Sequence, residues 1–223
     1  MNMKRCAAGF LLLGLACSGS QEETPVPTQA VPIAVGNYWI YQETDTVGQV
    51  DTLDTTVVLG DTLYQSHTAY VVAGYLMGTY DTAVFYYADS FLNAVYDMDL
   101  MGIIMPVDGK LMPEFLDVGQ HWQVFQGETT GIYLPPVFDS TDVVKLSIWA
   151  TVEDSGTRSV PAGSFDPVYT IHYDDTIYKN GGYMLSVWQY SWVAPGTGII
   201  QRDDDSLGQD PTAELVDYHL NQQ

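Results

Sequence analysis

The chain of 223 residues carries 28 acidic and only seven basic side chains, a formal net charge of −21 at pH 7. A surface of this sign repels phosphate backbones and anionic lipid headgroups, so it excludes nucleic acids as partners and a basic membrane-binding patch. About 190 residues follow the N-terminal 31, enough for one domain to bury a hydrophobic core without disulfides.

Residues 1–16 have the order of a secretory signal peptide. Lys4 and Arg5 form a short positive region, and the apolar run 7–16 follows it. Ten residues rise only ~15 Å as a helix, about half the thickness of a hydrocarbon core, so the run is too short for a permanent spanning helix. We expect residues 1–16 to be removed, which leaves five basic against 28 acidic residues and a formal net charge of −23.

The residues before Cys17 resemble the lipobox of bacterial lipoproteins, in which a small residue precedes a Cys that becomes lipid-modified. Ala16 and Cys17 match this motif, whereas Gly14 stands where it usually has Leu, so a secreted protein cut near Ala16 is the alternative. The resemblance implies that a lipid on Cys17 anchors the protein to a membrane of the cell envelope. Ser18 in place of Asp implies the outer membrane. Because Cys6 lies in the signal, the mature chain keeps no thiol for a disulfide, a zinc cluster or a nucleophile.

Residues 17–31 are expected to form a flexible tether, because they lack apolar periodicity and are rich in Ser, Gly, Pro, Gln and Glu. The folded domain is expected to span residues 32–223. It begins near Pro32, where a Gly turn leads into aromatic and β-branched residues.

Short β-rich runs then alternate with turns to the end of the chain. No window of twelve residues has a helical period; residues 113–118 are the best candidate for a short helical turn, and any helix is expected to be peripheral. The predicted strands are 38–44, 52–59, 68–74, 79–87, 94–98, 121–126, 143–152, 168–173, 183–193, 198–202 and 213–220.

The run 143–152 shows the period of two that is typical of a half-buried strand. One face contains only apolar residues, Val144, Leu146, Ile148, Ala150 and Val152. The opposite face is mostly polar, as in antiparallel sheets with one solvated face. With Gly, Asp and Pro turns between the strands, the sequence predicts an all-β fold, a single antiparallel meander curled into an open barrel, half-barrel or sandwich, with little helix.

Three short motifs carry a family resemblance. Residues 36–41, the turn 160–165 and the segment 192–200 resemble a recurrent set in uncharacterised bacterial envelope lipoproteins. That resemblance implies an open half-barrel similar to the periplasmic lipoprotein-carrier fold. It brings no catalytic residues with it.

The sequence contains no recognisable catalytic set. The four histidines lie far apart, without metal-binding spacing, and are expected to be strand residues rather than ligands. No Gly-x-Ser-x-Gly elbow occurs. Carboxylate pairs such as Asp97 and Asp99 arise by chance in a chain this acidic. We therefore expect a protein that is not an enzyme and that needs no cofactor.

One acidic segment matches part of a calcium-binding loop. Asp203, Asp205, Gly208 and Glu214 fall at positions 1, 3, 6 and 12 of such a loop. Leu207 occupies a ligand position, however, and strands rather than helices flank the segment. A solvated hairpin loop is the expected structure, with calcium binding as the alternative.

Aromatic residues give the remaining candidate site. Alternation places Trp188, Tyr190 and Trp192 on one strand face, and Trp149 lies on the polar face of its own strand. Core packing is the common use of such a stripe, whereas exposed rings would contact a ligand.

Two hypotheses for function follow. The first is a non-enzymatic envelope lipoprotein that binds an apolar ligand or another envelope component in its concavity. The alternative is a surface glycan-binding protein or hydrolase that uses the aromatic rings and the carboxylates.

Overall fold

The computed structural model describes residues 28–44, 50–76, 79–100, 103–130, 137–138, 140–203 and 212–221. Within them the chain forms strands and no helix, which confirms the predicted all-β class. The strands are β1 (Tyr38–Thr44), β2 (Val50–Tyr64), β3 (His67–Leu76), β4 (Thr79–Ala88), β5 (Phe91–Leu100), β6 (Ile103–Pro113), β7 (His121–Thr130), β8 (Val143–Val160), β9 (Gly163–Lys179), β10 (Gly182–Ala194), β11 (Gly198–Asp203) and β12 (Thr212–His219).

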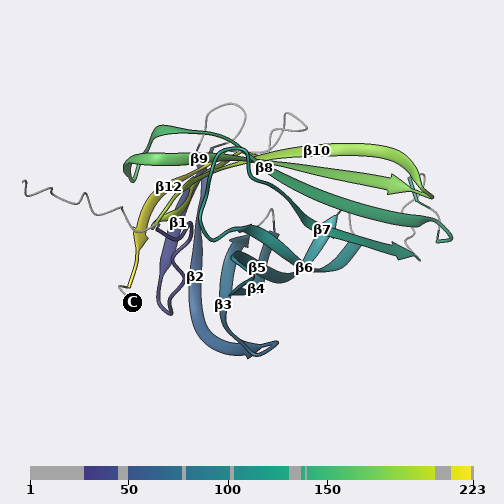
Figure 1. Cartoon of the computed structure of the whole chain (residues 1–223), viewed down its shortest axis with the longest axis horizontal. Coiled ribbons are helices and arrows are strands. Elements are labelled where there is room, and N and C mark those ends of the chain that lie inside the picture. The colour runs from purple at the N-terminus through teal and green to yellow at the C-terminus, as the bar shows by residue number, and fades with distance from the viewer. Residues whose placement is uncertain are drawn as a thin grey trace, which may run out of the picture.

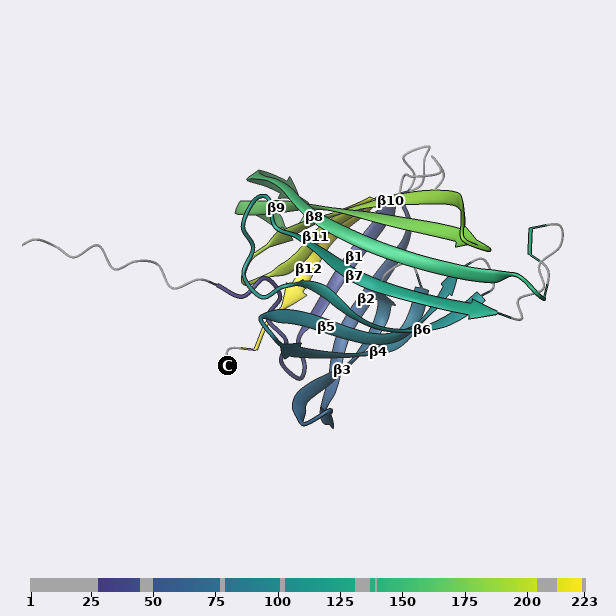
Figure 2. The ribbon, with the colours of Figure 1, turned by 45° about the vertical axis from the view of Figure 1, so that its right-hand side comes forward.

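The strands pair in one antiparallel sheet with the order β6-β5-β4-β3-β2-β1-β12-β11-β10-β9-β8-β7. Each half of the chain is a meander, and the pairing of β1 with β12 joins the two halves (Figure 1). The sheet curls until β6 and β7 lie near each other with no ladder between them, so the barrel is nearly closed with one seam (Figure 2). The predicted single meander in an open barrel is confirmed.

A side chain and a close backbone approach bridge the seam between β6 and β7. Nε1 of Trp122 on β7 donates a hydrogen bond to the carbonyl oxygen of Lys110 on β6, at 3.0 Å. A Cβ atom at Gly109 would lie 2.6 Å from the carbonyl oxygen of Val124, so glycine is what lets the two backbones come this close.

We expect Trp122→Phe to loosen the seam, because it removes the indole N–H and leaves the Lys110 carbonyl without that hydrogen bond. The expected loss in the free energy of unfolding is about 1–2 kcal/mol. Hydrogen exchange should speed up selectively at the amides of β6 and β7. Trp39→Phe is the matched control, since it removes another indole donor, the one to the Thr197 carbonyl at 2.6 Å, away from the seam. Equal exchange patterns in the two variants would contradict a role for Trp122 at the seam.

Apolar side chains from both halves of the chain fill the barrel as one core. The predicted apolar face of β8 is confirmed, because each of its five side chains is at most 1% exposed. Leu92 on β5 and Met112 on β6 are fully buried members of the same core. Burial of each large side chain contributes about 1.5–3 kcal/mol relative to exposure.

Strand β6 corresponds to none of the predicted strands. Its run IIMPVDGKLMP contains Pro106 and Gly109, which weaken a strand assignment. At a sheet edge, however, proline costs no ladder hydrogen bond on the unpaired side, and β6 is the edge of this sheet. Several other strands, most of all β2, β8 and β9, extend well beyond their predicted ends.

The candidate helical turn at residues 113–118 does not form. The chain there ends β6 and continues as a bend and a turn. Glu114 N–H donates to the Ser90 carbonyl, and the Glu114 carbonyl accepts from Ala30 N–H. Neighbouring segments therefore satisfy the backbone groups that a helix would have paired internally.

The segment 28–36 packs across one end of the barrel. Gly196 N–H donates to the Gln29 carbonyl at 2.7 Å, and the Tyr87 hydroxyl donates to the Val31 carbonyl. Ala30 and Val31, which the sequence analysis assigned to the tether, are buried together with Ile33. Packed structure thus begins before Pro32. No helix in the described ranges is long and apolar enough to cross a membrane.

Candidate functional site

Side chains that alternate with the core residues of β8, β9 and β10 form an aromatic surface on the outside of the barrel. These three strands run side by side along one wall (Figure 1). On β10, Ser191 and Val193 are buried, so the alternate residues face outward. We call this surface the outer aromatic face and define it by Trp149, His172, Asp174, Trp188, Tyr190 and Trp192.

Two tryptophans of this face are open to solvent and lie in register. Trp149 on β8 pairs with Asp174 on β9, and Asp174 pairs with Trp188 on β10. Trp149 is 39% exposed and Trp188 is 54% exposed. Two strand spacings separate their backbones by ~9.6 Å. Trp149, Asp174 and Trp188 therefore form a row across the three strands, with two indoles and a carboxylate between them.

Contacts with neighbours hold the Trp149 ring in place. The His121 ring stacks on it with centroids 5.0 Å apart and an interplanar angle of 8°. Nε1 of Trp149 donates to Oγ of Ser147 at 3.2 Å. One face of this indole is thus covered, and the ring loses little further freedom on binding a ligand.

Tyr190 and Trp192, in contrast, are occupied by protein partners. The His172 ring stacks on Tyr190 at 4.8 Å, and Tyr190 lies 6.1 Å from Trp192. The Arg158 guanidinium sits 3.8 Å above the Trp192 ring. Burial, with the nearby charges of Glu153 and Asp203, raises the pKa of Tyr190. Both rings are half-buried and less suited to contact a ligand than the open pair.

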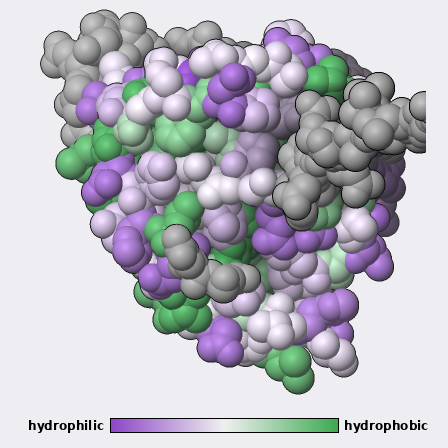
Figure 3. All heavy atoms as spheres, turned by 60° about the vertical axis from the view of Figure 1, so that its left-hand side comes forward, coloured by the Kyte–Doolittle hydropathy of each residue, from purple (hydrophilic) through white to green (hydrophobic). Residues whose placement is uncertain are grey.

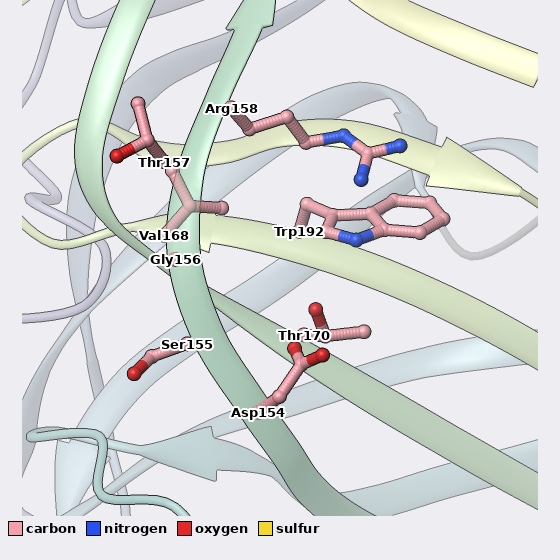
Figure 4. Close-up of a pocket in the computed structure, with 8 residues that line it drawn as sticks. All are labelled: Asp154, Ser155, Gly156, Thr157, Arg158, Val168, Thr170 and Trp192. Carbon is pink, nitrogen blue, oxygen red and sulfur yellow. The ribbon is translucent and has the colours of Figure 1, made fainter.

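A small pocket of about 150 Å³ adjoins Trp192. It forms where β8 departs from regular pairing with β9, between Val152 and Asp154 and again between Gly156 and Arg158. Arg158 lies along one side of the indole, with Thr170 and Asp154 on the other (Figure 4). Burial lowers the pKa of Arg158, while Glu214, Asp203 and Asp154 oppose that shift. The pocket can hold a small polar group.

Two further clefts flank the seam. One, of about 530 Å³, is lined by residues of both edge strands, including Asp108 and Gln123. The other, of about 410 Å³, lies by the turn after β6 and includes Phe115 and Asp117. Each of these clefts, like the pocket at Trp192, has a single carboxylate in its lining. On the face in Figure 3, hydrophobic residues occur in separate small groups among hydrophilic ones.

The predicted calcium residues are only partly described. Asp203 ends β11, and Glu214 lies on β12 opposite Gln201. Asp205 lies outside the described residues. Among the residues that the structure describes, no three His, Cys, Asp or Glu side chains form a metal-binding group. Calcium binding by Asp203, Asp205 and Glu214 stays a prediction, and Cys17 also lies outside the described residues.

The four histidines all lie in strands, as expected. His67 stacks on Tyr86 and His219 on Tyr38. The sequence analysis missed that His121 and His172 stack on aromatic candidates. The contact of Arg158 with Trp192 could not be predicted either, because the bulges in β8 change the register of its residues against β9.

No family model matches the chain, and no curated protein is similar in sequence. Two crystal structures are similar in fold. One is described as an exported protein with a YMCC-like fold from Bacteroides fragilis NCTC 9343; it is 14% identical, with a TM-score of 0.52 over 87% of this chain and 100% of that chain. The other is described as a lipoprotein from Parabacteroides distasonis ATCC 8503; it is 13% identical, with a TM-score of 0.49 over 87% of this chain and 100% of that chain.

At 14% identity, the likeness to the Bacteroides fragilis protein establishes a shared fold alone. The chain is thus an antiparallel barrel of the kind found in that protein. The more specific resemblance to the lipoprotein-carrier half-barrel stays a prediction.

Proposed function

We propose that the chain is a non-enzymatic lipoprotein of the bacterial envelope, anchored through a lipid on Cys17, that binds another envelope component on its outer aromatic face. The signal-like N-terminus and the fold shared with an exported protein support the location. The observation on which the binding role rests is the in-register, solvent-exposed pair Trp149 and Trp188. Large exposed aromatic rings on a folded domain mark interaction sites.

This proposal moves the binding surface from the inside of the barrel to the outside. The sequence analysis proposed the concavity for an apolar ligand, but Leu92, Ile148 and Leu215 fill it with side chains that are at most 1% exposed. A hydrolase acting on glycosides needs two carboxyl groups in one cleft. Each of the three described clefts is lined by one carboxyl group. We therefore propose binding rather than glycoside hydrolysis.

Cys17→Ala tests the anchor. The wild-type protein should incorporate labelled fatty acid and fractionate with membranes after an alkaline wash, because several acyl chains anchor a protein stably. The variant should lose the label and appear in the soluble fraction. Cys6→Ala is the matched control and should behave as the wild type, since Cys6 lies in the expected signal. Persistent membrane fractionation of Cys17→Ala would refute the lipid anchor, and an unlabelled, soluble wild type would favour the secreted alternative.

The same unanchored variant tests the binding role. Cys17→Ala protein should adsorb to washed bacterial envelopes, and a second substitution, Trp188→Ala, should abolish the adsorption. Phe115→Ala is the control, because Phe115 is an aromatic side chain 39% exposed at a different place, by the turn after β6. Equal adsorption of both double variants would exclude the outer aromatic face as the binding surface.

A further inference from the structure

We infer that the occupant of the outer aromatic face is an extended, uncharged, β-linked glycan that lies across β8, β9 and β10 and stacks alternate sugar rings on Trp149 and Trp188. This inference rests on the proposed function and names the class of its ligand. Its basis is the register of the row, the polar groups around the two indoles and the charge of the protein.

The spacing of the two indoles fits a chain of sugar rings. Trp149 and Trp188 stand two strand spacings apart, ~9.6 Å at the backbone, which is about the span of two linked pyranose rings. In an extended β-linked chain each ring is turned over relative to the one before it. Rings one and three then present the same C–H face to one side, so two indoles at this spacing can each stack one of them. A disaccharide is too short to cover both indoles.

The groups between and beside the indoles suit hydroxyl groups. Asp174 lies at the middle of the row, where the second ring would sit. Thr176 Oγ1 donates to its Oδ1 at 3.2 Å, so Oδ2 is the oxygen to accept a hydroxyl hydrogen from the sugar. On the far side of Trp149, Gln123 on β7 continues the row with an amide. A carboxylate and amides among aromatic rings pair with polyhydroxyl ligands through hydrogen bonds.

The neighbouring row adds hydroxyl groups on the same side of the sheet, of which Ser147 is buried and already accepts from Nε1 of Trp149. Ser147 pairs with Thr176, and Thr176 pairs with Ser186. The Thr176 and Ser186 hydroxyls lie 3.1 Å apart and already form one hydrogen bond. On this side of the row the two indoles are bordered by hydroxyl groups, which favours a hydroxyl-rich ligand over a lipid or an apolar peptide.

The charge of the protein narrows the class of glycan. With a formal net charge of −21 and Asp174 at the centre of the row, the surface repels polyanionic chains such as polyuronates. An uncharged chain escapes this repulsion. Stacking of sugar C–H groups on aromatic rings needs no charge on the ligand.

The test uses the unanchored full-length Cys17→Ala protein and titration calorimetry with uncharged oligosaccharides of two to six rings. The probes are β-1,4-linked glucose and N-acetylglucosamine oligomers, with α-1,4-linked glucose oligomers of equal length as the linkage control. We expect affinity to rise about tenfold between two and three rings, when the second indole is reached, and the α-linked series to bind at least tenfold more weakly.

Substitutions at the two indoles distinguish a specific loss of binding from a general loss of folding. Trp149→Ala and Trp188→Ala should each lower the affinity for the longer chains about tenfold and remove the dependence on length. Trp188→Phe should restore part of the affinity, and Phe115→Ala should leave it unchanged. Thermal melting of each variant checks that it is folded.

The outcomes distinguish this inference from the proposed function. Absence of binding to every uncharged chain, affinity independent of length, or equal binding of the α-linked series would overturn the glycan assignment. If envelope adsorption still depends on Trp188 in that case, the proposed function stands with another occupant. Binding to vesicles of uncharged phosphatidylcholine that requires Trp188 would identify that occupant as lipid.

Discussion

Gly74→Ala should lower the free energy of unfolding by about 3 kcal/mol or more, because strain and a steric clash coincide at this position. Gly74 on β3 has φ of +139°, a conformation that L side chains rarely adopt. A Cβ atom would lie 2.3 Å from the carbonyl oxygen of Thr55 and 2.7 Å from Cα of Thr56. Both are backbone atoms of β2, so no change of rotamer can relieve the contact.

The measurement is urea unfolding followed by tryptophan fluorescence. Gly60→Ala is the matched control, since Gly60 lies on β2, has no positive φ and has open space around its Cα. That substitution should change the free energy of unfolding by less than about 1 kcal/mol, because it adds neither strain nor a clash. If the two variants unfold at the same urea concentration, the close approach of β3 to β2 at Gly74 is not a constraint on the fold.

Raising the pH above 10 should unfold the barrel, because the barrel holds several tyrosines in their neutral form. Burial raises the pKa of Tyr41 to about 12, although the charge of Arg202 opposes the shift. Burial also raises the pKa values of Tyr87, Tyr96 and Tyr173 above their usual range. As the pH rises, these tyrosines therefore ionise at a lower pH in the unfolded chain than in the folded one.

The sign of the effect follows from proton binding. Below pH 10 each tyrosine keeps its proton in both states and the stability is complete. Between the unfolded pKa of 10 and the folded value, only the unfolded chain loses the proton, so the free energy of unfolding falls by ~1.4 kcal/mol per pH unit for each such tyrosine. For Tyr41 alone the loss is on the order of 2–3 kcal/mol once the pH has passed its folded pKa of about 12. Four such groups together exceed the stability of many domains, about 5–15 kcal/mol.

The measurement is a titration of tyrosinate absorbance in parallel with circular dichroism. Exposed tyrosines should ionise first, and the buried ones should ionise together with the loss of β structure. In Tyr41→Phe the fall of stability above pH 10 should be shallower, even though the loss of the hydroxyl hydrogen bond to the Ile199 carbonyl lowers stability at neutral pH. Ionisation of all tyrosines in one step, with the fold intact, would show that the four rings are not buried as described.

The local sequence pattern was sufficient to predict the strands in which apolar and polar residues alternate regularly. In β8, five consecutive inward positions are apolar, so the inward face can be read without knowing its neighbours. β6 could not be found in this way, because Pro106 and Gly109 interrupt its pattern. An edge strand tolerates Pro106, and the close approach of β7 accounts for Gly109, and both conditions are set by the curled sheet rather than by the local sequence.

The candidate site shows the same limit. Alternation correctly groups Trp188, Tyr190 and Trp192 on one side of β10, but it does not say which side is the outside of the barrel. That depends on whether the opposite set, with Ser191 and Val193, fits the core. The alignment of Trp149 with Trp188 depends further on register between strands, which bulges fix and which a single sequence does not reveal.

The packed segment 28–36 also bears on how the domain would respond to force. The chain that leads to Cys17 enters the fold through Gln29 and Ala30, whose backbones bond to Gly196 and Glu114. Gly196 lies in the turn between β10 and β11, and Glu114 directly follows β6. If Cys17 carries the proposed lipid anchor, tension on it would reach the hydrogen bonds to Gly196 and Glu114 first. Under that proposal, segment 28–36 would detach before the strand ladders carry the force.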